Sequence, residues 1–285
     1  MGGNALKQYG VTRISHPAYE QRLRQLNAYM ENLPEGIECT YFVPGGVVKE
    51  DHGDLDVLYY SNDPEKLIQH FKRLFGSVGS KKNGNCHSLE WMGFQVDFIY
   101  IRPGAFDFAS HYYAHGTYAA LLGKLARYYG FKLGWQGLHF VVKTKHREHT
   151  EEITLDWDEA VSILGYETVL DPKATLPVEE LYEHLISSKL IHKRIYKSSK
   201  PDRNYGFQEE FFEWIDIQAQ VADNGKSRAY GWCLITKRKP TMGVRLLHKH
   251  GRMILADWAQ PLRRKYRKLR FVHVEPFLYK CRGWL

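Results

Sequence analysis

Two aspartates stand one residue apart at the start of an apolar run, in the stretch GDLDVLYY at residues 53–60. The length of this run and its apolar residues predict a β-strand. Aspartate is a poor strand former, so two of them in one strand call for a physical reason. Side chains two residues apart in a strand share a face, so we expect Asp54 and Asp56 to project together while Leu55 and Val57 point to the core.

A third aspartate, Asp97, lies inside another apolar stretch, FQVDFIYI at residues 94–101. Together with CHSLEWM at 86–92 this stretch predicts a hairpin that turns at Gly93. The neighbours of Asp97 are apolar and point to the opposite face. If this strand pairs beside the first, the three carboxylates converge on one spot.

Three clustered carboxylates repel one another and raise each other's pKa values, and a hard divalent cation relieves this repulsion. Mg²⁺ prefers oxygen ligands and shares its shell with substrate phosphates, and two such ions clamp the oxygens of a phosphoryl transfer. We therefore predict a site for two Mg²⁺ ions, with Mn²⁺ as a substitute, held by Asp54, Asp56 and Asp97. The simpler alternative is that HGD is a hairpin turn with ordinary turn residues.

Glycines precede the first strand in the stretch GGVVKEDHGD, which begins at Gly45 and Gly46. Glycine lets backbone N–H groups approach a phosphate closely, and Lys49 adds a positive charge. This pattern predicts a binding site for the phosphates of a nucleotide.

The other patterns alternate between helices and strands, which predicts an α+β fold with a mixed sheet and flanking helices. We expect helices at residues 17–32, 63–76, 118–129, 156–166 and 177–193, a strand within 37–46 and a hairpin within 130–142. Asp63 and Asp156 are the expected N-caps of the helices at 63–76 and 156–166. The stretch LDPKATLP, within 169–177, is the best candidate linker. We predict two domains, residues 1–172 and an α/β accessory domain at 173–285.

Charge and composition constrain the partners. The 285 residues carry a formal net charge of +8, with 44% hydrophobic and 25% charged residues, which is typical of a globular protein and favours polyanionic partners. The stretch RRKYRKLR at 263–270 predicts contacts to nucleic acid, although such a run is also typical of a solvated helix face. The predicted nucleic-acid contacts are Arg263, Arg264, Lys265, Arg267 and Lys268.

The cysteines and the N-terminal sequence predict the compartment. The four cysteines lie far apart without zinc-like spacing, which favours reduced thiols in a cytoplasmic protein. We expect neither a signal peptide nor a membrane partner, because no apolar run has the required length. For a viral source the expected compartment is the host cytoplasm.

At this point the residues resemble the polymerase-beta-like nucleotidyltransferase superfamily, and most of all the palm of family X DNA polymerases. The superfamily pattern is Gly-Gly or Gly-Ser, then Asp-x-Asp, then a distant Asp. The resemblance extends over residues 40–172, through YYAHGTYAALLGKLARYYGFKLGWQGL at 112–138 and DWDEAVSILGYETVLDP at 156–172.

The resemblance implies roles for particular residues. Asp54 and Asp56 would ligate both metal ions, and Asp97 the ion that activates a primer 3′-hydroxyl. Gly46 and Lys49 would contact the incoming nucleoside triphosphate, and a second set would lie against its sugar and base. That set is Tyr113, Gly116 and Thr117, and His115 in the same turn has a weaker positional case.

The resemblance also has differences. Gly46, Lys49 and Gln95 stand where family X usually has serine, arginine and arginine. Residues 1–39 are too few for the lyase and helix-hairpin-helix modules of family X, which speaks against a gap-repair role.

Several functions remain open. The first is a compact DNA polymerase, with DNA preferred over RNA as the acceptor. The second is a non-templated transferase acting on RNA or DNA ends, or on a small molecule or protein. The third is a nucleic-acid-binding protein built on an inactive palm. The sequence leaves the oligomeric state open.

Overall fold

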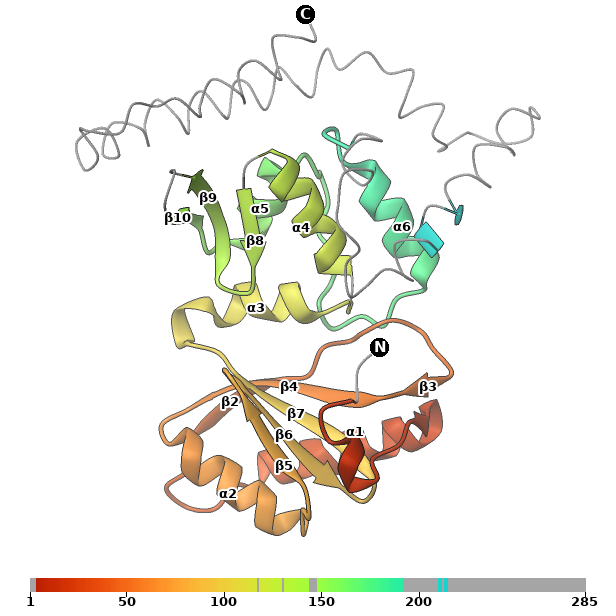
Figure 1. Cartoon of the computed structure of the whole chain (residues 1–285), viewed down its shortest axis with the longest axis vertical. Helices are drawn as coiled ribbons and strands as arrows, with labels where there is room; N and C mark the ends of the chain where they lie inside the picture. Colours follow the sequence, from red (N-terminus) through yellow and green to blue (C-terminus); the bar gives the residue numbers. More distant parts are fainter. Residues whose placement is uncertain are drawn as a thin grey trace, which may run out of the picture. The chain divides into compact units, whose positions relative to one another are not determined.

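The computed structural model of the chain describes residues 4–116, 118–129, 131–143, 148–191, 210–211 and 213–214. These residues form an α+β fold with six α-helices and a mixed five-stranded sheet (Figure 1). They divide into two compact units: the first reaches Gly116 and includes Leu170–Val178, and the second holds 117–169 and the described residues after 178. The predicted domain division at 172 and 173 stays a prediction, since most of 173–285 lies outside the described residues.

The first unit is built on the five-stranded sheet. Its strands lie in the order β2 (Cys39–Phe42), β4 (Asp54–Ser61), β7 (Phe94–Tyr100), β6 (Cys86–Trp91) and β5 (Ser80–Asn83). Strands β4 and β7 are parallel, and all other neighbours in this sheet are antiparallel. The predicted hairpin around Gly93 is therefore confirmed, and the two aspartate-bearing strands are neighbours, which is the condition for the three carboxylates to converge.

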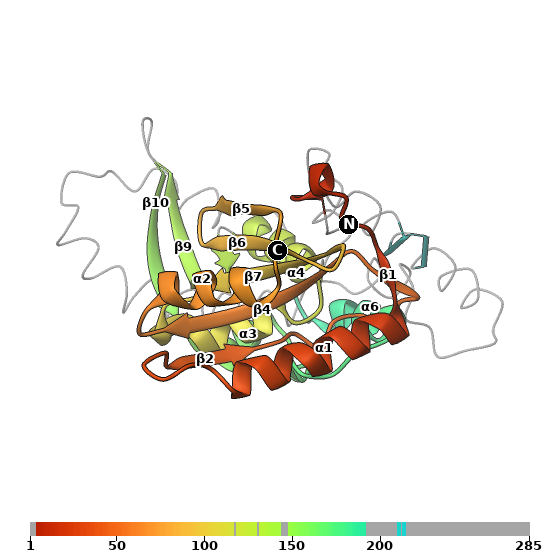
Figure 2. The ribbon, with the colours of Figure 1, turned by 90° about the horizontal axis from the view of Figure 1, so that it is seen from below.

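Two helices of the first unit cover one face of this sheet, α1 (His16–Glu31) and α2 (Pro64–Leu74), as Figure 2 shows. Helix α2 begins as predicted, because Asp63 Oδ1 accepts a hydrogen bond of 2.9 Å from the amide of Lys66. Alternate residues of the central strands pack against the helices and form the core. The core includes Leu26, Leu55, Val57, Leu67, Phe71, Leu89, Val96 and Phe98, all fully buried. The opposite face of the sheet carries the aspartates.

Some elements of the first unit do not follow from the sequence patterns. Strand β5 is polar and lies at the sheet edge, where pairing with β6 makes it a strand. The short β1 (Ile14–Ser15) pairs with β3 (Asp51–His52), which attaches the N-terminal segment to the stretch before β4. The 3₁₀-helices η1 (Lys7–Tyr9) and η2 (Pro103–Ala105) and helix α3 (Phe106–Tyr113) complete the unit.

The second unit contains a separate antiparallel sheet. Its order is β10 (Glu148–Thr154), β9 (Gly137–Lys143) and β8 (Phe131–Gly134), with helices α4 (Tyr118–Tyr128), α5 (Trp157–Ile163) and α6 (Val178–Ser187). Asp156 caps α5 as predicted, since its Oδ1 accepts from the amide of Glu159 at 2.8 Å. The polar β10 does not follow from its sequence, and α6 ends before the predicted position 193. No helix in the described ranges is both long and apolar enough to cross a membrane.

Candidate metal centre on the aspartate-bearing face of the sheet

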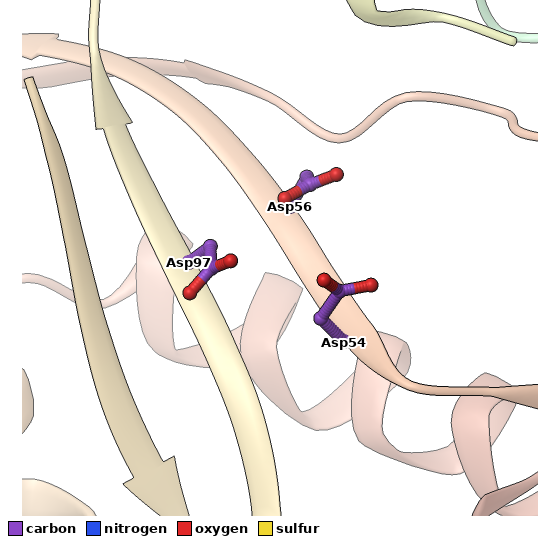
Figure 3. Close-up of side chains that lie close together, drawn as sticks. All are labelled: Asp54, Asp56 and Asp97. Atoms are coloured by element: carbon purple, nitrogen blue, oxygen red, sulfur yellow. The ribbon is translucent and has the colours of Figure 1, made fainter. Parts of the chain in front are cut away.

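The three predicted aspartates lie together in the structure. The parallel register of β4 and β7 places Asp56 directly opposite Asp97, and Asp54 is two residues before Asp56 on the same face. Figure 3 shows the three side chains on one side of the two strands. One carboxylate oxygen from each residue lies within 4.8 Å of the other two. Leu55 and Val57, between and beyond the β4 aspartates, are fully buried on the other face.

The surroundings make this cluster unfavourable when all its members are charged. Burial raises the pKa of Asp56 well above its ordinary value, and the charges of Asp54 and Asp97 raise it further, while Lys49 acts in the opposite direction. Burial is also the largest cause that raises the pKa of Asp97, with a contribution from Asp54. Hydrogen bonds from Ser88 and Gln95 oppose that rise. A divalent cation bound between the carboxylates would remove the repulsion.

The donor set fits the cation that we predict. All three ligands are carboxylate oxygens, which suit Mg²⁺ and Mn²⁺ better than metals that prefer sulfur or nitrogen. Among the described residues, this is the one group of three or more His, Cys, Asp or Glu side chains with metal-binding spacing. Asp54, Asp56 and Asp97 are therefore the residues that would hold the metal.

The glycine turn differs from what the sequence predicts for its backbone amides. The amides of Gly45, Gly46 and Val48 donate to the carbonyl oxygens of Pro172, Ala114 and Leu176, at 3.1, 2.7 and 2.9 Å. These donors are thus satisfied by the protein itself rather than presented to a phosphate. The binding of phosphates by Gly45 and Gly46 stays a prediction, and it requires these hydrogen bonds to be exchanged.

The segment Leu170–Val178 is more than a linker, because it pairs with this glycine turn. The amide of Leu176 donates to the carbonyl of Gly46, and Thr175 Oγ1 donates to the carbonyl of Gly45 at 2.7 Å. Val47 and Leu176 form a parallel β-bridge. The two segments therefore form a small paired structure whose members are far apart in the sequence.

Close packing explains why residue 45 is a glycine. A Cβ atom at this position would lie 2.2 Å from the carbonyl oxygen of Ala174, and that oxygen belongs to the backbone. We expect Gly45→Ala to separate the turn from Leu170–Val178 and to lower the free energy of unfolding by about 1–3 kcal/mol. Urea denaturation measures this change, and Gly104→Ala is the matched control because a Cβ there has no neighbour within 4 Å. Equal stability of the two variants would contradict the proposed packing.

The remaining predicted nucleotide contacts have different surroundings. Lys49 is exposed, and its charge opposes the rise in the pKa of Asp56. Tyr113 is the last residue of α3. Its pKa is raised mainly by burial and further by Tyr112 and Asp56, so the charge of Asp56 acts on its hydroxyl. Gly116 has a φ of +59°, a conformation that favours glycine. Thr117 lies outside the described residues, and so do Arg263, Arg264, Lys265, Arg267 and Lys268.

His115 has a structural contact in this conformation. Its side chain is buried, and its Nδ1 lies 3.2 Å from the carbonyl oxygen of Gly46. A carbonyl only accepts, so this nitrogen carries the proton and donates. His115 therefore holds the glycine turn in place.

Two neutral side chains bind Asp97 and were not among the predicted site residues. Gln95 Nε2 lies 3.0 Å from both carboxylate oxygens of Asp97, and Ser88 stands opposite Asp97 in the register of β6 and β7. The signal for Gln95 is its position two residues before Asp97, which places both side chains on one face. Ser88 gives no comparable signal, because its contact depends on the register of the hairpin.

A comparison of the chain with protein-family models and with curated proteins found no match.

Proposed function

We propose that the chain is a metal-dependent nucleotidyltransferase with a polymerase-beta-type palm, and in particular a compact family-X-like DNA polymerase. One observation carries the proposal: Asp54, Asp56 and Asp97 converge at matched register on two parallel strands. Polar carboxylates on strands that are otherwise apolar oppose both strand propensity and burial. Such a local conflict is expected where chemistry requires it.

The proposed reaction joins a nucleotide to a 3′-hydroxyl. The hydroxyl oxygen forms a bond to the α-phosphorus of a nucleoside triphosphate, the bond from that phosphorus to the bridging oxygen breaks, and pyrophosphate leaves. The proton of the hydroxyl passes to solvent water as the hydroxyl oxygen becomes part of the phosphodiester. When bound, two Mg²⁺ ions neutralise charge on the attacking and leaving oxygens.

The chain's own residues position these reactants. On β4, Asp54 and Asp56 would bind the metal ions beside the triphosphate. On β7, Asp97 would bind the metal ion beside the acceptor hydroxyl. Lys49 is exposed, and its positive charge acts to lower the pKa of Asp56. The same charge would neutralise a triphosphate oxygen. Positioning and charge neutralisation supply most of the rate enhancement in such a reaction.

A non-templated transferase is the second candidate, and one observation favours it. Gln95 stands where family X usually has arginine, and its side-chain amide is hydrogen-bonded to Leu6 and Asp97. This position therefore offers no cation to a templated acceptor strand. We propose that the accessory region at 173–285, with Arg263, Arg264, Lys265, Arg267 and Lys268, holds the nucleic acid in either case.

Nucleotide incorporation tests the proposal. Labelled single-stranded and primer–template DNA and RNA are incubated with Mg²⁺ or Mn²⁺ and each dNTP or NTP singly, with Asp54→Ala as the control. We expect extension that follows the template base and is lost in the control. Extension that does not depend on the template base would support the non-templated transferase and contradict the polymerase. No incorporation on any of these nucleic acids would refute the polymerase and a transferase acting on nucleic-acid ends, and would leave transfer to a small molecule or protein, or a binding role.

A further inference from the structure

Gln95 connects the third aspartate to the N-terminal segment. Its side chain is 1% exposed, and its Nε2 donates to Oδ1 and Oδ2 of Asp97, both at 3.0 Å. Its Oε1 accepts a hydrogen bond of 3.1 Å from the backbone amide of Leu6. Leu6 and Gln95 are 89 residues apart in the sequence, so this connection exists only in the folded chain.

The two partners fix the orientation of the amide. A backbone N–H only donates and an ionised carboxylate only accepts, so Leu6 requires the oxygen of Gln95 and Asp97 requires its nitrogen. The reverse orientation would place the amide oxygen against a carboxylate and the NH₂ group against an N–H. Leu6 therefore holds the donor end of Gln95 against Asp97.

The N-terminal segment is docked on the sheet at several points. The side chain of Leu6 is fully buried. The amide of Thr12 donates to the carbonyl of Gly93 at 2.8 Å, in the turn between β6 and β7. The ring of Tyr9 packs so closely on Gly79 that a Cβ there would lie 2.4 Å from it. These contacts hold the Leu6 amide in a defined place beside Gln95.

We propose that Gln95 is a positioning residue for Asp97, and that docking of the N-terminal segment at Leu6 sets the metal affinity of the site. This inference rests on the proposed metal-dependent function. A neutral amide orients the carboxylate by hydrogen bonding without neutralising it, so the full charge of Asp97 remains for the cation. Partners that orient a metal ligand in this way typically contribute a factor of about 10–100 to metal affinity.

The test measures the binding of Mn²⁺ to the full chain by titration, with free Mn²⁺ detected by electron paramagnetic resonance. We expect Gln95→Met and Leu6→Ala each to weaken Mn²⁺ binding about tenfold or more. The Mn²⁺ affinity of the double variant should equal that of the more strongly affected single variant, because both changes break the same connection. Leu26→Ala is the matched control, since Leu26 is also fully buried but lies on α1 in the core of the opposite face. It should lower thermal stability and leave the Mn²⁺ affinity of the folded protein unchanged.

The outcomes separate this inference from the proposed function. If the wild type binds no Mn²⁺, or Asp97→Asn binds it equally well, the metal centre itself is refuted. If Asp97→Asn weakens binding but Gln95→Met and Leu6→Ala do not, only the positioning role is refuted. Additive effects in the double variant would also overturn it. If Gln95→Met fails to fold, Leu6→Ala still tests the positioning role, because it leaves the residues of the sheet unchanged.

Discussion

Replacement of Asp56 by asparagine is expected to stabilise the metal-free protein and, at the same time, to lower nucleotide transfer about a thousandfold. The two effects have one cause. The pKa of Asp56 is raised well above its ordinary value by burial and by its two neighbouring carboxylates, so its charged form is unfavourable in the metal-free fold. Asparagine removes this charge but also removes one ligand of the proposed metal site.

The measurement combines thermal unfolding in a chelator with a rate assay at saturating metal. A thousandfold loss corresponds to about 4 kcal/mol of transition-state stabilisation. Asp107→Asn is the control, because Asp107 is exposed in the first turn of α3 and is not one of the three clustered aspartates. A variant that loses stability in chelator, or that retains its activity, would contradict the proposed role of Asp56.

Added Mn²⁺ is expected to stabilise the protein, and more strongly as the pH rises. A ligand that binds only the folded state stabilises it by about 2.7 kcal/mol at a concentration a hundred times its Kd. Because the pKa values of Asp56 and Asp97 are raised, protons compete with the cation for these carboxylates up to a higher pH than for ordinary aspartates. Raising the pH removes those protons, so the affinity for Mn²⁺ increases.

In the metal-free protein, the contribution of these two carboxyls to stability changes with pH in the opposite direction. Because these two carboxyls have higher pKa values in the folded state than in the unfolded chain, the folded state binds more protons between the two values. Their contribution to stability therefore falls as the pH rises through that window. Thermal unfolding of wild type and Asp56→Asn, at several pH values with and without Mn²⁺, isolates the contribution of Asp56. A wild-type melting temperature that does not respond to Mn²⁺ would refute the metal site.

Much of the site could be predicted because its signals are local. The spacing of Asp54 and Asp56 places both on one face of any strand, and Asp97 interrupts an apolar strand whose neighbours must be buried. The caps of Asp63 and Asp156 are equally local, since each accepts from an amide three residues later. These predictions needed only the geometry of a single element.

Other features depended on pairing between distant segments. The polar strands β5 and β10 exist because each has a neighbouring strand, and their own residues do not favour a strand. The glycines at 45 and 46 suggested amides directed at a phosphate, but three amides of this turn are satisfied by carbonyls of the first unit. The sequence could not show this, because hydrogen bonds of a turn depend on which segment lies beside it.

By itself, then, the sequence determined the alternation of the strands, the helix starts and the shared face of Asp54 and Asp56, because these follow from periods of two and 3.6 residues. Only the tertiary structure decided that Asp56 faces Asp97, that Leu170–Val178 closes on the glycine turn and that Leu6 reaches Asp97 through Gln95. These contacts join residues far apart in the chain. The register of β4 and β7 is a property of the whole sheet, which packs against α1 and α2, and no local sequence pattern determines it.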